Sequence, residues 1–136
     1  MVKENNKMPT YTRKEVLERL AMSRDFRSLD IRKANLVKID FSGCDMRKAN
    51  LSYANLKDCN FTNCDLRGTS LWNSNCEGAN FTNANLEEAD LDYAKLRGAT
   101  LFQANIRRAS LPEETISRDE ILRSVEAGGR IGQNRR

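Results

Sequence analysis

The chain has 136 residues, 39% of them hydrophobic and 31% charged, and this length suits one small domain instead of a multidomain catalytic machine. The formal net charge is +4 and the positive charges form no long run, so the sequence gives only weak support for a dedicated nucleic-acid surface. Histidine is absent, which excludes histidine general bases, histidine metal ligands and Ser/His or Cys/His nucleophile pairs.

Residues 1–23 are predicted to form an N-terminal tail followed by a short helix. Residues 1–11 lack the apolar stretch of a signal peptide, and no segment approaches the roughly 18 apolar residues of a membrane span. We therefore expect a cytoplasmic protein without membrane contact. Thr12 to Glu15 fit a capping box, and the helix that follows would carry an apolar stripe made of Val16, Leu17, Leu20 and Ala21.

Residues 24–113 divide without a gap into 18 units of five residues. The third residue of every unit is apolar, the first is Ala in ten units and Cys in three, and the second is Asp or Asn in 14. A period of five suits neither a long helix nor a long strand, so the chain must turn once per unit. Because residues two apart on an extended segment point the same way, the pattern predicts a solenoid with a narrow, filled core.

A slower period of 20 residues predicts that four units make one coil. Phe41, Phe61 and Phe81 lie 20 residues apart. A spacing of 15, as between Cys44 and Cys59, favours a three-sided coil instead. Asparagines of the second position would either bond from coil to coil as an amide ladder or act as turn residues, and both roles are structural.

The units ANLSY at 49–53 and ADLDY at 89–93 resemble the A(D/N)LXX repeats of the pentapeptide-repeat family, and the resemblance covers about two thirds of the chain. It implies an all-β fold, the right-handed quadrilateral β-helix solenoid. An open stack would expose strand edges and core at each end, so we expect short helical caps at both ends. Proteins of this family are mostly bacterial, and many have no assigned biochemical role.

Residues 114–136 are predicted to form a C-terminal helix and a flexible tail. Ser117 to Glu120 fit a second capping box, and Gly128 ends an apolar stripe made of Ile121, Leu122 and Val125. This helix would be a lid on the last coil, and the alternative is a homodimer contact. Residues 130–136 are expected to be a solvated tail.

The sequence offers no catalytic, metal or cofactor site. The four cysteines occupy inward positions and are expected to be buried thiols, and Cys44 and Cys64 would form a disulfide only with distortion. Without CxxC or histidine there is no zinc pattern. Acidic residues are numerous between 77 and 92, but we expect no concave pocket in which they would act, and therefore no enzyme.

Two outward groups are the candidates for partner binding. Tyr53, Trp72 and Tyr93 would lie on one side of the solenoid, where exposed aromatic rings commonly anchor protein contacts; the alternative is that they only shield the sheet surface. The best basic stripe is the column of Arg27, Arg47, Arg67 and Arg107. Aspartates in the same units would neutralise this stripe, which favours a solvated face.

The leading hypothesis is a rigid, non-enzymatic scaffold for protein–protein interaction with an unknown protein partner. The resemblance also implies a second reading, because one branch of the family mimics DNA and binds DNA gyrase. That mimicry needs an acidic rod, whereas Lys and Arg slightly outnumber Asp and Glu in these repeats. A third reading is weak nucleic-acid binding through the arginine column.

Overall fold

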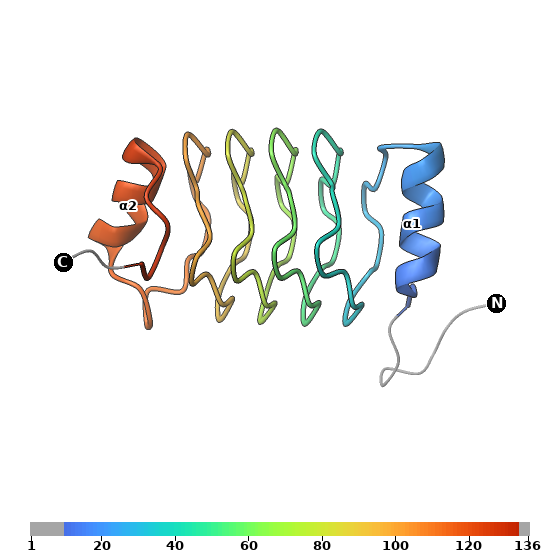
Figure 1. Ribbon diagram of the computed structural model, residues 1–136, viewed down its shortest axis with the longest axis horizontal. Coiled ribbons are helices and arrows are strands. Elements are labelled where there is room, and N and C mark those ends of the chain that lie inside the picture. Colours follow the sequence, from blue (N-terminus) through green and yellow to red (C-terminus); the bar gives the residue numbers. More distant parts are fainter. Residues whose placement is uncertain (1–9, 134–136) are drawn as a thin grey trace.

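The computed structural model describes residues 10–133 and shows a short stack of coils with one helix at each end (Figure 1). Helix α1 spans Arg13–Met22 and helix α2 spans Arg118–Ala127. Between them the chain forms isolated parallel bridges, each joining residues 20 apart, from Asp25 with Asp45 to Asp90 with Ser110. The coil therefore contains four units, and the three-sided alternative is wrong.

Each side of a coil is too short to form an extended strand, and each side ends in a tight turn. The amide of Ala54 donates to the carbonyl of Leu51 at 3.1 Å, and the same bond recurs unit after unit. The fifth residue of the unit stands at the corner with positive φ, as in type II turns. Glycine and asparagine adopt this conformation most readily, and they fill many of the corners.

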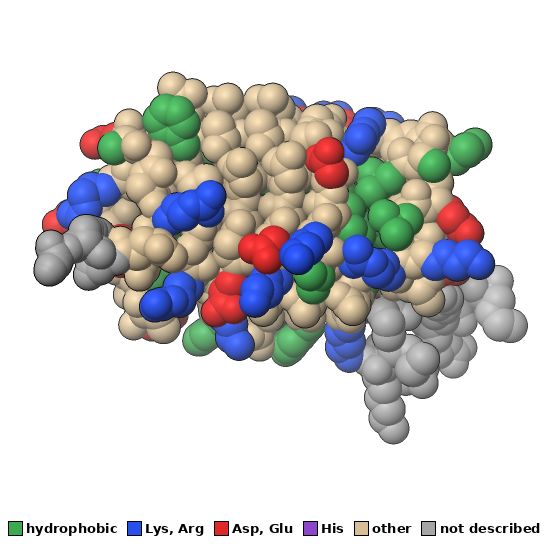
Figure 2. Space-filling model, in the orientation of Figure 1, with side chains coloured by type: hydrophobic (Ala, Val, Ile, Leu, Met, Phe, Trp, Pro, Cys, Tyr) green, Lys and Arg blue, Asp and Glu red, His purple; other side chains and the backbone are tan. Residues whose placement is uncertain are grey.

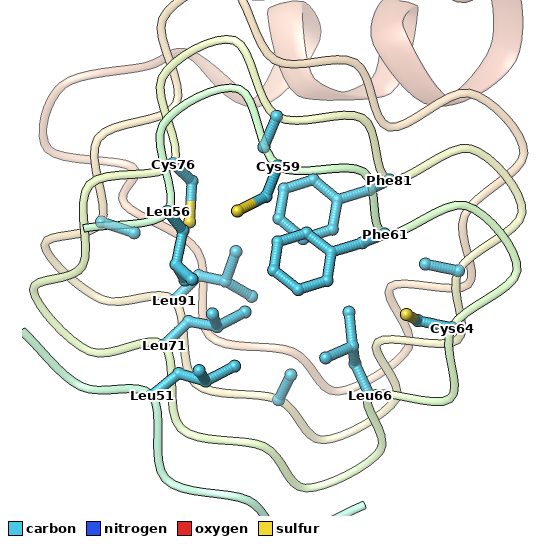
Figure 3. Packing of buried hydrophobic residues seen from close by; sticks show 14 of the residues in the cluster. Leu51, Leu56, Cys59, Phe61, Cys64, Leu66, Leu71, Cys76, Phe81 and Leu91 are labelled. Atoms are coloured by element: carbon cyan, nitrogen blue, oxygen red, sulfur yellow. The ribbon is translucent and has the colours of Figure 1, made fainter. Parts of the chain in front are cut away.

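The interior is a set of stacked columns, as the sequence predicts. The rings of Phe41, Phe61 and Phe81 stack with centroid separations of 5.4 and 5.1 Å and interplanar angles of 7°. Figure 3 shows Leu51, Leu71 and Leu91 in a second column, with the smaller side chains filling the remaining width. All four cysteines are buried and free, so the stack needs no covalent bridge among them.

The carbonyls at the N-terminal edge of the stack accept hydrogen bonds from side chains. Arg19 Nε donates to the Asp25 carbonyl at 3.0 Å, and Arg24 Nη1 donates to the Asp40 carbonyl at 3.1 Å. Two further carbonyls of the first coil accept from Thr10 and Arg13, so one carbonyl on each of the four sides has a donor.

The amides at the C-terminal edge donate to the C-terminal segment. Leu101 N donates to Ser124 Oγ at 2.9 Å in a buried contact. The amide of Gly98 donates to the Ile131 carbonyl, and the Ile131 amide returns a bond to Ala99. Ile131 is only 2% exposed and Gly132 is partly buried, so the expectation of a solvated tail is wrong for these two residues. Arg130 and Gln133 are exposed, and 134–136 lie outside the described residues.

Both predicted apolar stripes are partly wrong. On α1 only Val16 is buried, whereas Leu17 is 44% exposed, because a ten-residue helix meets the narrow coil along one line only. On α2, Ile121 and Ser124 face the stack, and Leu122 faces outward.

The two capping boxes also differ. The first is complete, with Thr12 and Glu15 bonding reciprocally. In the second, Ser117 Oγ accepts from Glu120 N at 3.1 Å, but the Glu120 carboxylate accepts from the Gly132 amide instead of the cap amide. The Glu120 carboxylate therefore bonds the C-terminal segment, and the second capping box lacks its reciprocal hydrogen bond.

Candidate functional site

The structure brings Tyr53, Trp72 and Tyr93 into one aromatic cluster. The centroids of Tyr53 and Trp72 are 5.3 Å apart at 75°, and those of Trp72 and Tyr93 are 5.7 Å apart at 79°. The two tyrosines are 49% and 57% exposed, whereas the indole is half-buried between successive coils. The predicted grouping is therefore correct, but Trp72 also packs against its neighbours and is not a free ring on the surface.

The tyrosines of the aromatic cluster occupy corners that do not favour them. Tyr53 and Tyr93 have φ of 61° and 63°, in the left-handed region, where a bulky side chain is strained. The corner between them in the same column is Asn73, the residue type best suited to this conformation after glycine. The fold therefore does not require tyrosine at either corner.

Charged groups flank the aromatic cluster unevenly. Toward the N-terminus Arg32 pairs with Asp30 at 2.9 Å. Toward the C-terminus lie the carboxylates of Asp90, Asp92 and Glu114, which we call the acidic rim. Burial, and then the proximity of Asp90 and Glu114, raise the pKa of Asp92. Among residues 10–133 no Lys or Arg forms an ion pair with any carboxylate of the acidic rim.

The arginine column is neutralised by its own repeats. Arg27, Arg47 and Arg67 pair with the aspartate two residues before them, at 2.8, 2.6 and 2.6 Å. Arg47 Nε also lies 3.6 Å from Asp65 of the next coil. Hydrogen bonds from Arg47 and Arg67 lower the pKa of Asp45 and Asp65. Figure 2 shows Lys and Arg side chains interspersed with Asp and Glu on one face.

Arg107 differs from the other members of the column. It forms no ion pair within residues 10–133, and Asn105 stands two residues before it, where Arg27, Arg47 and Arg67 have an aspartate. One unpaired arginine at the end of a neutralised ladder does not make a basic stripe.

The thiols are poor candidates for chemistry. Burial raises the pKa of Cys59, Cys64 and Cys76 to about 12, and it also raises that of Cys44. Cys59 Sγ donates to the Leu36 carbonyl at 2.9 Å, and Cys64 Sγ donates to that of Phe41 at 2.8 Å. Low thiolate content and buried sulfur atoms argue against nucleophilic or redox roles.

A groove lies between the stack and the C-terminal segment, so the expectation of no concavity is wrong. Its volume is about 510 Å³. Ala94, Leu96, Ile116 and Ile131 form its apolar floor, and its other lining groups include Tyr93, Glu77, Lys95, Arg97, Glu114 and Glu120. We call it the C-terminal groove. Tyr93 belongs both to this groove and to the aromatic cluster, so the two surfaces are continuous.

Sequence reasoning missed Glu114 and Ile116 because neither belongs to the repeat. Their placement depends on how the chain turns back after Pro112, which no periodicity encodes. The signal for the acidic rim was available, since Asp90 is followed by Asp92 where four other aspartates are followed by arginine.

Two further classes of site find no support within the described chain. Among residues 10–133, no three His, Cys, Asp or Glu side chains are grouped so as to hold a metal ion. Neither α1 nor α2 is long and apolar enough to cross a membrane.

Comparison with known sequences identifies the repeat. The family profile of pentapeptide repeats matches residues 25–63, 59–98 and 79–113. No curated protein sequence gives a significant match to the chain.

Several solved structures are similar to the chain. Rfr23, a pentapeptide repeat protein from the cyanobacterium Cyanothece 51142, is 27% identical over 70% of this chain and 88% of its own, with a TM-score of 0.38. HetL, involved in heterocyst differentiation regulation in the cyanobacterium Nostoc sp. strain PCC 7120, is 32% identical over 72% of this chain and 44% of its own, with a TM-score of 0.42. QnrB1, a plasmid-mediated fluoroquinolone resistance protein, is 18% identical over 66% of this chain and 62% of its own, with a TM-score of 0.43.

Proposed function

The chain belongs to the pentapeptide-repeat family, and we propose that it is a rigid, non-enzymatic interaction module that binds a protein partner through its aromatic cluster. Membership of the family implies the right-handed quadrilateral β-helix, in agreement with the four-unit coil. In this proposal α1 and α2 cap the two ends of the stack, and the protein works in the cytoplasm.

One observation carries the proposal. Two half-exposed tyrosines occupy left-handed corners, where they are strained, and they contact the half-buried indole of Trp72. Exposed aromatic rings held in fixed positions are the commonest anchors of protein interfaces, because they bury much apolar area and lose little side-chain entropy. Other corners hold Gly, Asn, Lys or Glu, so the turn itself does not select an aromatic ring, and a role in binding would account for the two tyrosines.

The other candidate functions have less support. Nucleic-acid binding needs cations free to meet phosphates, and three of the four arginines in the column already pair with aspartates. Gyrase binding by DNA mimicry needs an acidic rod, and this chain carries a net charge of +4. A homodimer contact through α2 would use Leu122, the only large apolar side chain that α2 exposes within residues 10–133.

The test replaces both tyrosines by the residue that the turn prefers. Tyr53→Asn/Tyr93→Asn should keep a cooperative unfolding transition, because asparagine tolerates positive φ. The variant should lose capture of the protein partner from lysate of the source organism. Lys38→Asn/Lys48→Asn makes the same change at two corners outside the aromatic cluster and should capture normally. Unchanged capture by the tyrosine variant would exclude the aromatic cluster as the interface.

A further inference from the structure

The acidic rim breaks the charge rule of the repeats. Asp25, Asp30, Asp45 and Asp65 are each followed two residues later by an arginine that pairs with them. Asp90 is instead followed by Asp92, whose amide donates to the Asp90 carboxylate at 2.9 Å. The two like charges therefore stand side by side on one face, with Glu114 close enough to act on Asp92. A cation from another molecule would relieve this repulsion.

The acidic rim adjoins both the aromatic cluster and the C-terminal groove, because Asp92 precedes Tyr93 and Glu114 lines the groove. Asp92 is one coil along the same column from Trp72 and adjacent to Tyr93 in sequence. Beyond Tyr93 the groove offers an apolar floor, and its charged lining is Glu77, Glu114 and Glu120 against Lys95 and Arg97. Aromatic faces, carboxylates and an apolar groove thus form one surface on which carboxylates exceed cations, although the protein as a whole is basic.

We propose that this surface binds a basic peptide segment, with an arginine side chain against the aromatic cluster and the acidic rim and an apolar side chain in the C-terminal groove. The inference rests on the proposed function and names the chemistry of the partner. It follows from charge complementarity, because carboxylates outnumber the two cations, Lys95 and Arg97, on this surface, and an anionic partner would be repelled.

Arginine fits this surface better than lysine. Its planar guanidinium stacks on the faces of Tyr and Trp rings and pairs with carboxylates through several fixed donors. The ammonium of lysine is more strongly hydrated and offers no plane to stack. The groove beyond Tyr93 gives the same peptide a place to bury an apolar side chain, which adds the non-polar part of the binding free energy.

The experiment uses Trp72 as the reporter, because it is the only tryptophan in the chain. The probe is a capped nonapeptide with two arginines and two leucines in a Gly/Ser background. We expect saturable change in the emission of Trp72, and an affinity that falls with added NaCl. Peptides in which glutamate replaces arginine, or serine replaces leucine, should bind more weakly by about tenfold or more, and lysine should be intermediate.

Two variants with equal loss of negative charge make the test specific. Asp90→Asn/Asp92→Asn keeps the acceptor oxygen for the amide of residue 92 and should weaken arginine-peptide binding by about tenfold. Glu18→Gln/Glu87→Gln removes the same charge from α1 and from another side of the coil, and should bind like the wild type. Equal affinity of both variants for the peptide would overturn the inference.

The result can be separated from that of the tyrosine experiment. If the arginine peptide does not bind, while Tyr53→Asn/Tyr93→Asn still loses its protein partner, the partner is not a basic peptide and the interaction module stands. If the peptide binds equally well to the tyrosine variant, the aromatic cluster takes no part in binding it, and the inference is overturned. Saturation that occurs only together with dimer formation in sedimentation would point to a second copy as the occupant and would also overturn the inference.

Discussion

At the scale of the residue, the Asp or Asn of each unit is a turn-forming acceptor. In all 14 units that carry it, its side-chain oxygen accepts the amide two residues later, as Asn50 does from Ser52 at 3.0 Å. The amide ladder is a minor feature, present where Asn105 donates to Asn85 at 3.1 Å and Asn60 donates to Asp40. Of the two structural roles predicted for this position, the turn role is the general one.

Because the oxygen alone is needed for the turn, Asp→Asn exchanges isolate the effect of charge. The pKa of Asp92 is raised in the folded state, so its ionised form opposes folding above that pKa. Asp92→Asn should therefore raise Tm at pH 7 by roughly 1 to 3 °C. The gain should fade as the pH falls through the raised folded-state pKa, and it should be absent below the ordinary range of Asp, about 4, where both states are protonated. Thermal unfolding followed by circular dichroism at pH 7 and pH 3 measures this difference.

Asp65→Asn is the matched control of opposite sign. The pKa of Asp65 is lowered by Arg67, so its charge contributes stability that is present above the unfolded-state pKa and lost as the pH falls through the folded one. This variant should lower Tm at pH 7 and differ less from the wild type in acid. A shift of the same sign for Asp65→Asn and Asp92→Asn would contradict the assigned environments.

The four cysteine thiols should be unreactive in the native protein. Their sulfur atoms are buried and the pKa of three of them is about 12, so almost no thiolate exists at pH 8. We expect a thiol reagent such as DTNB to release no colour within minutes from the folded chain, and to titrate four thiols per chain in denaturant. Rapid reaction of one or two thiols under native conditions would show local opening of the stack.

At the scale of the element, the repeats were predictable and their ends only in part. The inward residues of the stack follow from a period that is repeated 18 times. A local exception does not alter the predicted register, as with Ile39, which stands at the first position of its unit, where most units have Ala or Cys. The helices occur once each, and their orientation depends on edge hydrogen bonds. The side chains of Arg19 and Ser124 each bond a backbone group at an end of the stack. An apolar stripe in the sequence predicts which face of a helix is apolar, but it does not predict such polar contacts with unpaired backbone groups.

Ser124 is the sharpest test of the C-terminal edge. Its Oγ accepts from the buried amide of Leu101, which has no further coil to bond with. Ser124→Ala removes that acceptor, and an unsatisfied buried amide costs about 1–3 kcal/mol. The variant should unfold at lower urea concentration with an unchanged m-value. Arg123→Ala, one residue away on the exposed side of α2, should stay within about 0.5 kcal/mol of the wild type.

At the scale of the whole molecule, the stacking of near-identical coils along one axis explains how much of the site the sequence could predict. The period of 20 residues placed Tyr53 and Tyr93 in one column and Trp72 in the column beside it, because every coil repeats the geometry of the one before. The C-terminal groove and Glu114 were not predictable, since they arise where the repetition stops. When a site is formed partly by repeats and partly by a unique segment, the sequence therefore predicts only the residues that the repeats contribute.

The same order makes the middle coil indispensable to the stack. Leu66 is fully buried near the centre of the rod, and each coil is held by the coils on either side of it. Leu66→Arg would bury an unpaired guanidinium, at a cost of several kcal/mol or more, against a total stability of about 5 to 15 kcal/mol. Loss of that coil would also open two new edges, each with unpaired backbone groups and uncovered core.

We therefore expect Leu66→Arg to lack a cooperative thermal transition and to show the far-UV circular dichroism of an unfolded chain, whereas the spectrum of the wild type should be β-dominated with a minor helical part. Thr62→Arg is the control, because it places arginine at the outward position of the preceding unit, the position that Arg67 occupies in its own. That variant should unfold cooperatively within a few degrees of the wild type, about the range of a surface substitution. A folded Leu66→Arg protein would mean that position 66 does not point into the core, which would contradict the register on which the aromatic cluster also depends.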